Sequence, residues 1–184
     1  MRTGANSVET MQKDANIILV GFMGTGKTTV GRLLAGRLRR EFVDMDVLIE
    51  ARERRPIPAI FRDFGEPYFR QLERALVREL AARRALVIAP GGGIVLDPEN
   101  IADFQRCGLV VCLEASPEAI LRRVEHDTNR PLLATPDKLG RIRELLEKRR
   151  PLYEAIPLRV DTSDLTTDEV VLSILDLFAH AAAE

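Results

Sequence analysis

The sequence predicts an α/β fold in which helices cover both faces of a parallel sheet. Strand-like apolar segments alternate with helix-like segments along the chain, which is the pattern of a parallel sheet. A glycine-rich turn joins the first strand to the first helix, and no repeat or interdomain linker interrupts the 184 residues. A chain of this length forms one domain with a core of its own. Strands are expected at residues 17–20, 42–43, 85–89, 109–113 and 158–160.

Helices are expected in the intervals between these strands. Apolar residues at positions 30, 33, 34 and 38 share one face of a helix over residues 27–40. Gly65 separates a short helix over residues 56–64 from a long one over residues 67–84. Ser116 followed by Pro117 has the character of an N-cap with proline in the first turn, ahead of a helix over residues 118–125. The remaining helices are expected at residues 47–54, 98–106, 138–150 and 166–180.

The composition argues against binding to nucleic acid or to a membrane. The 27 basic residues are offset by 28 acidic ones, so the net charge is −1 and bulk electrostatic binding is not indicated. No run of 18 apolar residues predicts a transmembrane helix, and the polar residues 1–15 lack the apolar stretch of a signal peptide. We expect residues 1–15 to be a disordered leader, or the remnant of a tag, and residues 16–184 to form a single cytoplasmic domain.

Residues 21–29 carry the pattern G-x-x-x-x-G-K-[ST] between a strand and a helix, which is the context of a P-loop. Glycines allow successive backbone N–H groups to converge on phosphate oxygens at the positive end of the helix. Lys27 adds a point charge, and Thr28 offers a hydroxyl to Mg²⁺. The alternative is a chance match in a flexible turn, which the flanking strand and helix disfavour. The residues expected to bind the nucleotide are Gly24, Thr25, Gly26, Lys27, Thr28 and Thr29.

Two carboxylates, Asp44 and Asp46, stand at the end of the second strand. Ligands of open parallel sheets collect at the carboxyl ends of the strands, so both side chains are expected to reach the P-loop. If the strand continues that far, the two point the same way, and they can divide the tasks of supporting Mg²⁺ and orienting an acceptor hydroxyl. The alternative is that Asp46 caps a helix that starts at Val47.

Two further segments have the character of ligand-binding loops. Gly91, Gly92 and Gly93 follow the third strand and allow the backbone to approach a ligand closely, although a plain turn is the alternative. The segment of about residues 126–137 is polar, contains prolines and lies between two helices, which is typical of mobile lids and of ordinary surface loops alike.

Six segments together resemble the shikimate kinases, in order and in approximate spacing. The resemblance covers about residues 16–178, nearly the whole chain, although any single motif beyond the P-loop is a weak signal. One departure is Pro90, which stands where the family commonly has a small or hydroxyl residue. The six segments are residues 21–29, 42–46, 69–73, 91–93, 130–133 and 149–153.

The resemblance implies an adenylate-kinase-like P-loop fold, a three-layer α/β sandwich with five parallel strands in the order 2-3-1-4-5. It also implies MgATP-dependent phosphorylation of the 3-hydroxyl of shikimate, a step toward chorismate and the aromatic amino acids. The expected ligands are ATP, shikimate and Mg²⁺, and a monomer is expected.

On the nucleotide side, the resemblance implies that Thr28 binds Mg²⁺ and that Asp44 supports it. Arg130 matches a lid arginine that reaches the phosphates, and Arg123 matches one that lies against adenine. Lys27, Asp46 and Arg130 are the residues that the resemblance makes catalytic.

On the acceptor side, Asp46 matches the aspartate that contacts the shikimate hydroxyls and orients or deprotonates the nucleophile. Arg70 and Arg149 match two arginines that clamp the carboxylate, and guanidinium forks suit that planar group. Gly91, Gly92 and Gly93 are expected to line the substrate, with Gly92 touching it. Glu73 lies three residues after Arg70, where it can hold that fork in place. Arg150, next to Arg149, leaves the second arginine ambiguous by one residue, although the register of the motif favours Arg149. Arg70 or Arg149 could instead form an ion pair on a helix surface.

Two other functions fit parts of this pattern. One is a different small-molecule kinase of the same fold, acting on gluconate or on a nucleoside monophosphate. The pair of carboxylate-binding arginines disfavours the nucleoside monophosphate, because its kinase would instead recognise a base and a phosphate. The other is a sensor that binds the ligands without turnover. It is disfavoured by the presence of Lys27, Thr28, Asp44, Asp46 and Arg130.

Overall fold

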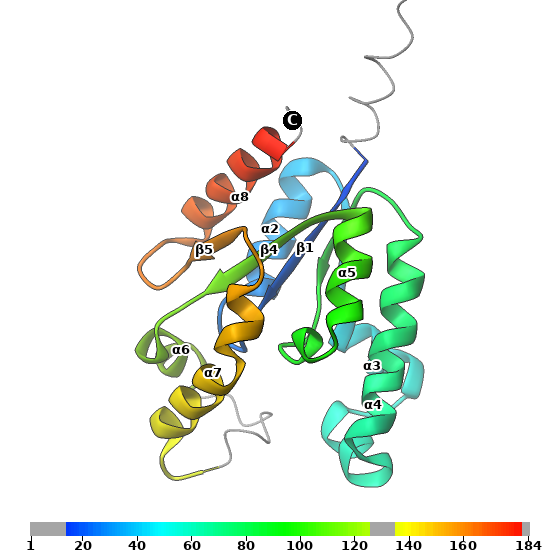
Figure 1. Cartoon of the computed structure of the whole chain (residues 1–184), viewed down its shortest axis with the longest axis vertical. Helices are drawn as coiled ribbons and strands as arrows, with labels where there is room; N and C mark the ends of the chain where they lie inside the picture. The colour runs from blue at the N-terminus through cyan, green and yellow to red at the C-terminus, as the bar shows by residue number, and fades with distance from the viewer. Residues whose placement is uncertain (1–13, 126–134, 182–184) are drawn as a thin grey trace, which may run out of the picture.

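A computed structural model describes residues 14–125 and 135–181 of the chain. Most of the expected leader, most of the expected lid and Arg130 therefore lie outside the described residues. The described part contains a sheet of five parallel strands in the order β2-β3-β1-β4-β5, as predicted (Figure 1). The strands are β1 Asn16–Gly21, β2 Glu41–Asp44, β3 Leu86–Ala89, β4 Gly108–Glu114 and β5 Arg159–Asp161.

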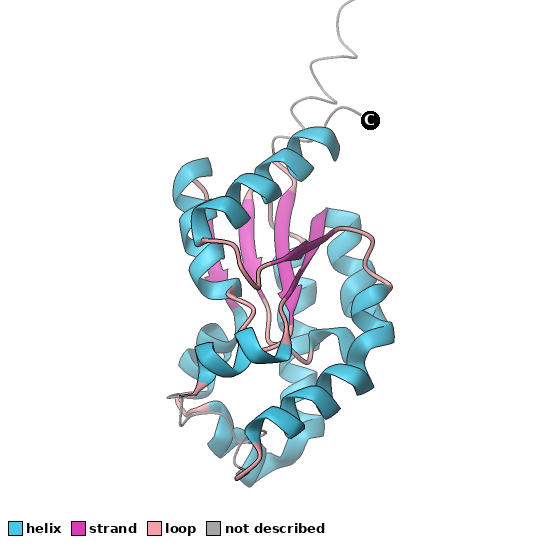
Figure 2. Cartoon of the chain, turned by 90° about the vertical axis from the view of Figure 1, so that its left-hand side faces the viewer, coloured by secondary structure: helices cyan, strands magenta, loops and turns pink. Residues whose placement is uncertain are grey.

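Helices pack on both faces of this sheet, so the fold has three layers (Figure 2). Each of these strands is followed by at least one helix, which is the βα alternation expected from the sequence. The helices are α2 Lys27–Leu38, α3 Met45–Glu53, α4 Ile57–Ala81, α5 Pro98–Cys107, α6 Pro117–Val124, α7 Lys138–Glu154 and α8 Thr167–Ala181, with a short 3₁₀ helix η1 at Ile94–Leu96.

The central strand β1 is buried along its whole length and divides the core in two. Ile17 and Leu19 belong to the apolar cluster formed with α2 and α8, whereas Ile18 and Val20 belong to the cluster formed with α4, α5 and α7. Successive side chains of a strand point to opposite faces, so a parallel strand covered on both faces reads as a continuous apolar run. Cys107 and Cys112 lie in this core as free thiols.

Two helices differ from their predicted bounds for reasons of capping and packing. The helix expected from residue 47 begins at Met45, because the side chain of Asp44 accepts hydrogen bonds from the backbone N–H groups of Asp46 and Val47. The hypothesis that Asp46 caps this helix is therefore wrong, and so is the idea of Asp44 and Asp46 on one continuing strand. Helix α7 runs through Pro151 to Glu154 instead of ending at residue 150, and this extension buries Tyr153.

The other predicted helices are present with small shifts. Gly65 (φ 81°, ψ 168°) interrupts the helical backbone within α4, at the predicted break. Ser116 caps α6 by accepting a hydrogen bond from the N–H of Ala119, with Pro117 in the first turn, as predicted. The short helix η1 after the three glycines was not predicted. In the part of the chain that the structure describes, no helix is long and apolar enough to cross a membrane.

At the carboxyl end of the sheet, α6 and α7 lie on one side and α3 and α4 on the other (Figure 1). The P-loop follows β1, Asp44 and Asp46 lie at the end of β2 and just after it, and the three glycines follow β3. The strand order places these three strands side by side. The predicted loops therefore meet at one edge of the sheet.

Candidate active site

Two cavities meet at this edge. The first, of about 530 Å³, surrounds the P-loop and is here called the donor cavity. The second, of about 550 Å³, lies between α3, α4, the three glycines and α7 and is called the acceptor cavity. Both share a wall, so two ligands bound in them would be neighbours. The shared residues are Met23, Asp44, Asp46, Gly91 and Gly92.

The P-loop residues lie together in the donor cavity, as expected. Gly26 has the left-handed conformation (φ 96°) and precedes the first turn of α2, which directs the N-terminus of that helix toward the cavity. The Thr25 hydroxyl donates to the Phe22 carbonyl at 2.8 Å, which tightens the turn from within. The ammonium group of Lys27 donates to the carbonyls of Gly21 and Phe22 at 2.8 and 2.9 Å, so its charge is held inside the loop.

Thr28 and Asp44 are joined side chain to side chain. Oγ1 of Thr28 donates to Oδ2 of Asp44 at 2.8 Å, while Oδ1 of Asp44 caps α3. Because the Thr28 hydroxyl donates its hydrogen to Asp44, its oxygen lone pairs stay available. The pair therefore offers hard oxygen ligands of the kind that Mg²⁺ takes. The described residues contain no group of three or more His, Cys, Asp or Glu side chains able to hold a metal. The donor set thus fits a cation that shares its ligands with phosphates and water.

Asp46 stands where the two cavities join. Its half-buried carboxyl group has a pKa raised to about 6, mainly because burial disfavours the charged form and also because Asp44 is close, while Lys27 acts in the opposite direction. Its atom Oδ1 is buried and has no hydrogen-bond partner among the described residues. A Cβ atom at position 91 would lie 2.7 Å from this oxygen, so the close approach requires glycine there. An acceptor with no partner therefore faces the junction.

Glu73 and Arg70 form an ion pair on α4, as the spacing of three residues predicted. Arg70 Nη1 donates to Oε2 of Glu73, whose side chain is only 1% exposed. Burial raises the pKa of Glu73 to about 7, although the charge and hydrogen bond of Arg70 lower it. The other oxygen, Oε1, is buried and without a hydrogen-bond partner in the described part of the chain.

The guanidinium group of Arg70 is held on several sides in the acceptor cavity. Nε and Nη2 donate to Oε1 of Glu66 at 3.1 and 2.8 Å, and the group packs directly against Gly93. It also lies 5.3 Å from the ring centroid of Phe69. These contacts fix the orientation of the fork.

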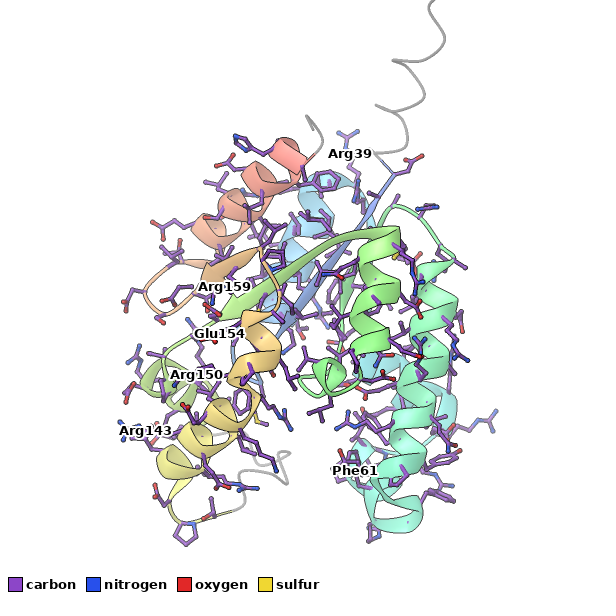
Figure 3. The ribbon with its side chains drawn as sticks, viewed as in Figure 1. Arg39, Phe61, Arg143, Arg150, Glu154 and Arg159 are labelled. Carbon is purple, nitrogen blue, oxygen red and sulfur yellow. The ribbon has the colours of Figure 1, made fainter. Side chains whose placement is uncertain are left out.

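Arg149 lies on the opposite side of the acceptor cavity, on α7. Its Nη1 donates to the Gly92 carbonyl at 3.2 Å, and its guanidinium lies 5.9 Å from the centroid of the Phe22 ring. Arg150 instead pairs with Glu147 and is exposed on the side of α7 that faces away from Phe61 and α4 (Figure 3). Of the two neighbouring arginines, Arg149 is therefore the one that lines the acceptor cavity.

Arg123, at the end of α6, lies at the other end of the donor cavity. It donates to Oγ1 of Thr162 at 2.9 Å, to the Thr162 carbonyl and to the Gly24 carbonyl at 3.3 Å. Thr162 is buried and its Oγ1 lies 3.1 Å from the Thr25 carbonyl, so this residue links β5 to the P-loop. Arg123 is thus held at the rim by groups from two loops.

Several lining residues were not predicted. In the donor cavity they follow β5, in a polar stretch without a recognisable motif; in the acceptor cavity they form an apolar wall on α4 and just before it. Only their place in the fold identifies them. They are Thr162, Leu165, Thr166, Thr167 and Val170 in the first cavity, and Pro56, Ile57, Pro58, Phe61 and Phe69 in the second.

The chemistry of the two cavities differs. The donor cavity offers backbone N–H groups, Lys27 and the Thr28–Asp44 pair, which suit the phosphates of a nucleotide and a divalent cation. The acceptor cavity offers two guanidinium groups and an apolar wall, which suit a small molecule that carries a carboxylate. Asp46, between them, is placed to accept a proton or a hydrogen bond from a hydroxyl group.

Comparisons with known proteins agree with this arrangement. The sequence profile of the family described as shikimate kinase matches residues 23–179. A shikimate kinase of Caldanaerobacter subterraneus subsp. tengcongensis is 46% identical over 160 residues, which cover 87% of this chain and 94% of the relative. The solved structure of the shikimate kinase from Acinetobacter baumannii in complex with shikimate matches with a TM-score of 0.87 and 39% identity, covering 95% of this chain and 98% of that one. A gluconokinase from Sinorhizobium meliloti 1021 matches with a TM-score of 0.59 and 20% identity, covering 92% and 94% of the two chains, and shows a shared fold alone.

Proposed function

This chain belongs to the shikimate kinase family, and we propose that it transfers the γ-phosphoryl group of ATP to the 3-hydroxyl of shikimate. The products are ADP and shikimate 3-phosphate. The observation that carries this proposal is the junction of the two cavities at Asp46, with Arg70 and Arg149 on the acceptor side. Membership of this family also decides against the gluconate and nucleoside monophosphate kinases considered above.

On the acceptor side, Arg70 and Arg149 bind the carboxylate of shikimate from opposite walls. Each fork donates paired N–H groups to the planar carboxylate, which fixes both the position and the rotation of the ring. The apolar wall that includes Phe61 and Phe69 supports the carbon face of the ring. The hydroxyl-bearing edge then points to the wall formed by Asp46 and Gly92.

At the junction, Asp46 accepts a hydrogen bond from the 3-hydroxyl and orients its oxygen toward the γ-phosphorus atom. As the new O–P bond forms and the bond to the bridging oxygen of ADP breaks, the hydroxyl proton passes to the Asp46 carboxylate. A pKa of about 6 leaves this group ionised at neutral pH and close to the optimum for a general base. Phosphoryl transfer has a loose transition state, so orientation of the hydroxyl is the larger part of this role.

On the donor side, the backbone of residues 24–29 and Lys27 hold the phosphates, and Arg123 lies against the adenine. Thr28 would hold Mg²⁺ directly and Asp44 would hold it through water. When bound, the cation neutralises charge on the β- and γ-phosphates. Arg130 as a phosphate-binding residue and residues 126–137 as a lid stay predictions, because they lie wholly or mostly outside the described residues.

Residues 16–184 are proposed to act as one kinase domain, as a monomer in the cytoplasm. The single family match over residues 23–179 supports one domain across most of this range.

An ADP-release assay with a panel of acceptors tests the function. We expect turnover with shikimate far above the ATPase background, and background rates with quinate, gluconate and nucleoside monophosphates. A shikimate rate equal to the background would overturn the proposal. Arg149→Ala and Arg150→Ala form a matched pair of variants for the same assay. The first should raise KM for shikimate much more than KM for ATP. The second should leave both within about twofold, because Arg150 is exposed and pairs with exposed Glu147.

A further inference from the structure

The Gly92 carbonyl accepts hydrogen bonds from two side chains of α7. The Tyr153 hydroxyl donates to it at 2.8 Å, and Arg149 Nη1 donates to it at 3.2 Å. Residues four apart lie on the same face of a helix, so both side chains approach the glycine loop from one direction. A carbonyl oxygen has two lone pairs, and here both are used by one helix.

Tyr153 is a permanent donor in this arrangement. Its side chain is buried, at 6% exposure, at the end of α7 that continues beyond Pro151. Burial raises the pKa of the phenol to about 12, although the charge and a hydrogen bond of Arg149 act to lower it. The hydroxyl therefore keeps its proton at neutral pH, and it lies in contact with the Arg149 guanidinium as well as with Gly92.

Gly92 itself is pressed against the P-loop. A Cβ atom at this position would lie 3.3 Å from the Met23 nitrogen and 3.5 Å from the Gly21 carbonyl oxygen. The Gly92 carbonyl is thus fixed between the P-loop and α7, in the wall that the two cavities share. A side chain that holds this carbonyl therefore also holds the acceptor of the Arg149 hydrogen bond.

We propose that Tyr153 is a positioning residue. Its hydroxyl group holds the Gly92 carbonyl and so orients Arg149 toward the substrate carboxylate. This inference rests on the proposed function, because it assigns a role in binding shikimate. Without the hydroxyl, Arg149 is the remaining side-chain donor to this carbonyl among the described residues. The carbonyl then attracts the Arg149 guanidinium more strongly, and the paired hydrogen bonds from that group to the substrate carboxylate become weaker.

The first test is Tyr153→Phe, with Tyr68→Phe as the matched control. Both variants remove one phenolic hydroxyl; that of Tyr68 bonds to Glu53 at 3.1 Å and joins α4 to α3 outside the lining of either cavity. We expect Tyr153→Phe to raise KM for shikimate about threefold to tenfold, the range for one lost hydrogen bond, with KM for ATP and kcat within about twofold. Tyr68→Phe should change none of the three. An unchanged KM for shikimate, or equal rises for shikimate and ATP, would overturn the inference.

The second test shows whether Tyr153 acts through Arg149. In an Arg149→Lys background the lysine cannot form the fork, so the added effect of Tyr153→Phe should fall below about twofold. The same loss of effect is expected in the unmodified background with the carboxamide analogue of shikimate, which has no charge for Arg149 to bind. A full effect of Tyr153→Phe in both of these settings would contradict the proposed role. Turnover of shikimate by the unmodified chain is measured first, so a failure of the proposed function is seen separately.

Discussion

Thr28 Oγ1 and Asp44 Oδ2 are joined by a hydrogen bond of 2.8 Å that links the first turn of α2 to the end of β2. The same aspartate caps α3 with its other oxygen. One carboxylate therefore serves the proposed cation site and the start of the helix that carries Asp46. These two tasks can be separated, because an asparagine caps a helix as well as an aspartate does but carries no charge.

We therefore expect Asp44→Asn to raise the free Mg²⁺ concentration needed for half-maximal activity by about tenfold, because a neutral amide attracts the hydrated cation less. The free energy of unfolding should change little, since the cap is kept. Asp44→Ala is the comparison. It should show the same rise in the Mg²⁺ concentration needed for half-maximal activity, and it should also lose about 1 kcal/mol of stability. A Mg²⁺ titration of activity, with urea unfolding of both variants, measures these changes. An unaltered Mg²⁺ requirement in Asp44→Asn would remove Asp44 from the cation site.

Asp46→Asn should lower kcat about a hundredfold or more and leave the affinity for ATP nearly unchanged. The amide has the size of the carboxylate but cannot take the proton of the hydroxyl group. It also has one hydrogen-bond acceptor atom where the carboxylate has two. ATP affinity can be followed by calorimetry without shikimate. If the variant lost ATP binding to the same extent as turnover, Asp46 would belong to the donor cavity alone.

Glu73 makes stability depend on pH. Its pKa is raised from 4.5 to about 7 in the folded chain, so the folded state binds the proton more tightly than the unfolded state does. The stabilisation from this group is complete below about pH 4.5 and is lost as the pH rises toward 7. Between pH 5 and pH 8, the unmodified chain should lose on the order of 1–3 kcal/mol more stability than Glu73→Gln does.

Urea unfolding of both proteins at the two pH values measures this difference. Asp46, whose pKa is also raised, is present in both proteins, so its contribution largely cancels. Equal slopes of stability against pH in the two proteins would show that the pKa of Glu73 is not raised in the folded chain.

Gly91→Ala should lower kcat/KM for shikimate at least about tenfold, because the new methyl group would lie 2.7 Å from Oδ1 of Asp46 and 3.3 Å from Oε1 of Glu73. Gly36→Ala is the matched control. Gly36 lies on an exposed turn of α2 with no atom within 4 Å of the added methyl group, so its replacement should leave activity unchanged and add about 0.5–1 kcal/mol of stability. Steady-state kinetics and thermal unfolding distinguish the two. Full activity in Gly91→Ala would mean that the contact with Asp46 has no role in turnover.

The alternation of strands and helices was readable from the sequence because each element carries its own periodicity. The apolar run of β1 and the stripe of α2 depend on local pattern and on burial, and both were predicted. The capping role of Asp44 was not, because Asp44 and Asp46 satisfy the same cap preference. The choice depends on where β2 stops pairing with β3, at Asp44 opposite Ala89.

The site residues that could be predicted were likewise those with a local sequence pattern. Lys27, Thr28, Asp46, Arg70 and Arg149 stand in segments with a recognisable pattern, and all of them line the two cavities. Thr162 and Tyr153 were assigned no role, because their contacts join residues far apart in sequence, such as Thr162 with Thr25 and Tyr153 with Gly92. A hydroxyl just after a short strand or at the end of a helix has many possible partners, and only the packing of β5 and α7 selects one.

The product of the reaction tests the central claim most directly. The purified chain is incubated with ATP, Mg²⁺ and shikimate, and the products are followed by phosphorus and proton magnetic resonance. We expect one new phosphate ester, coupled to the proton on carbon 3 of shikimate, formed in equal amount with ADP. Inorganic phosphate as the only new phosphorus product, or an ester on another hydroxyl, would contradict the proposed transfer.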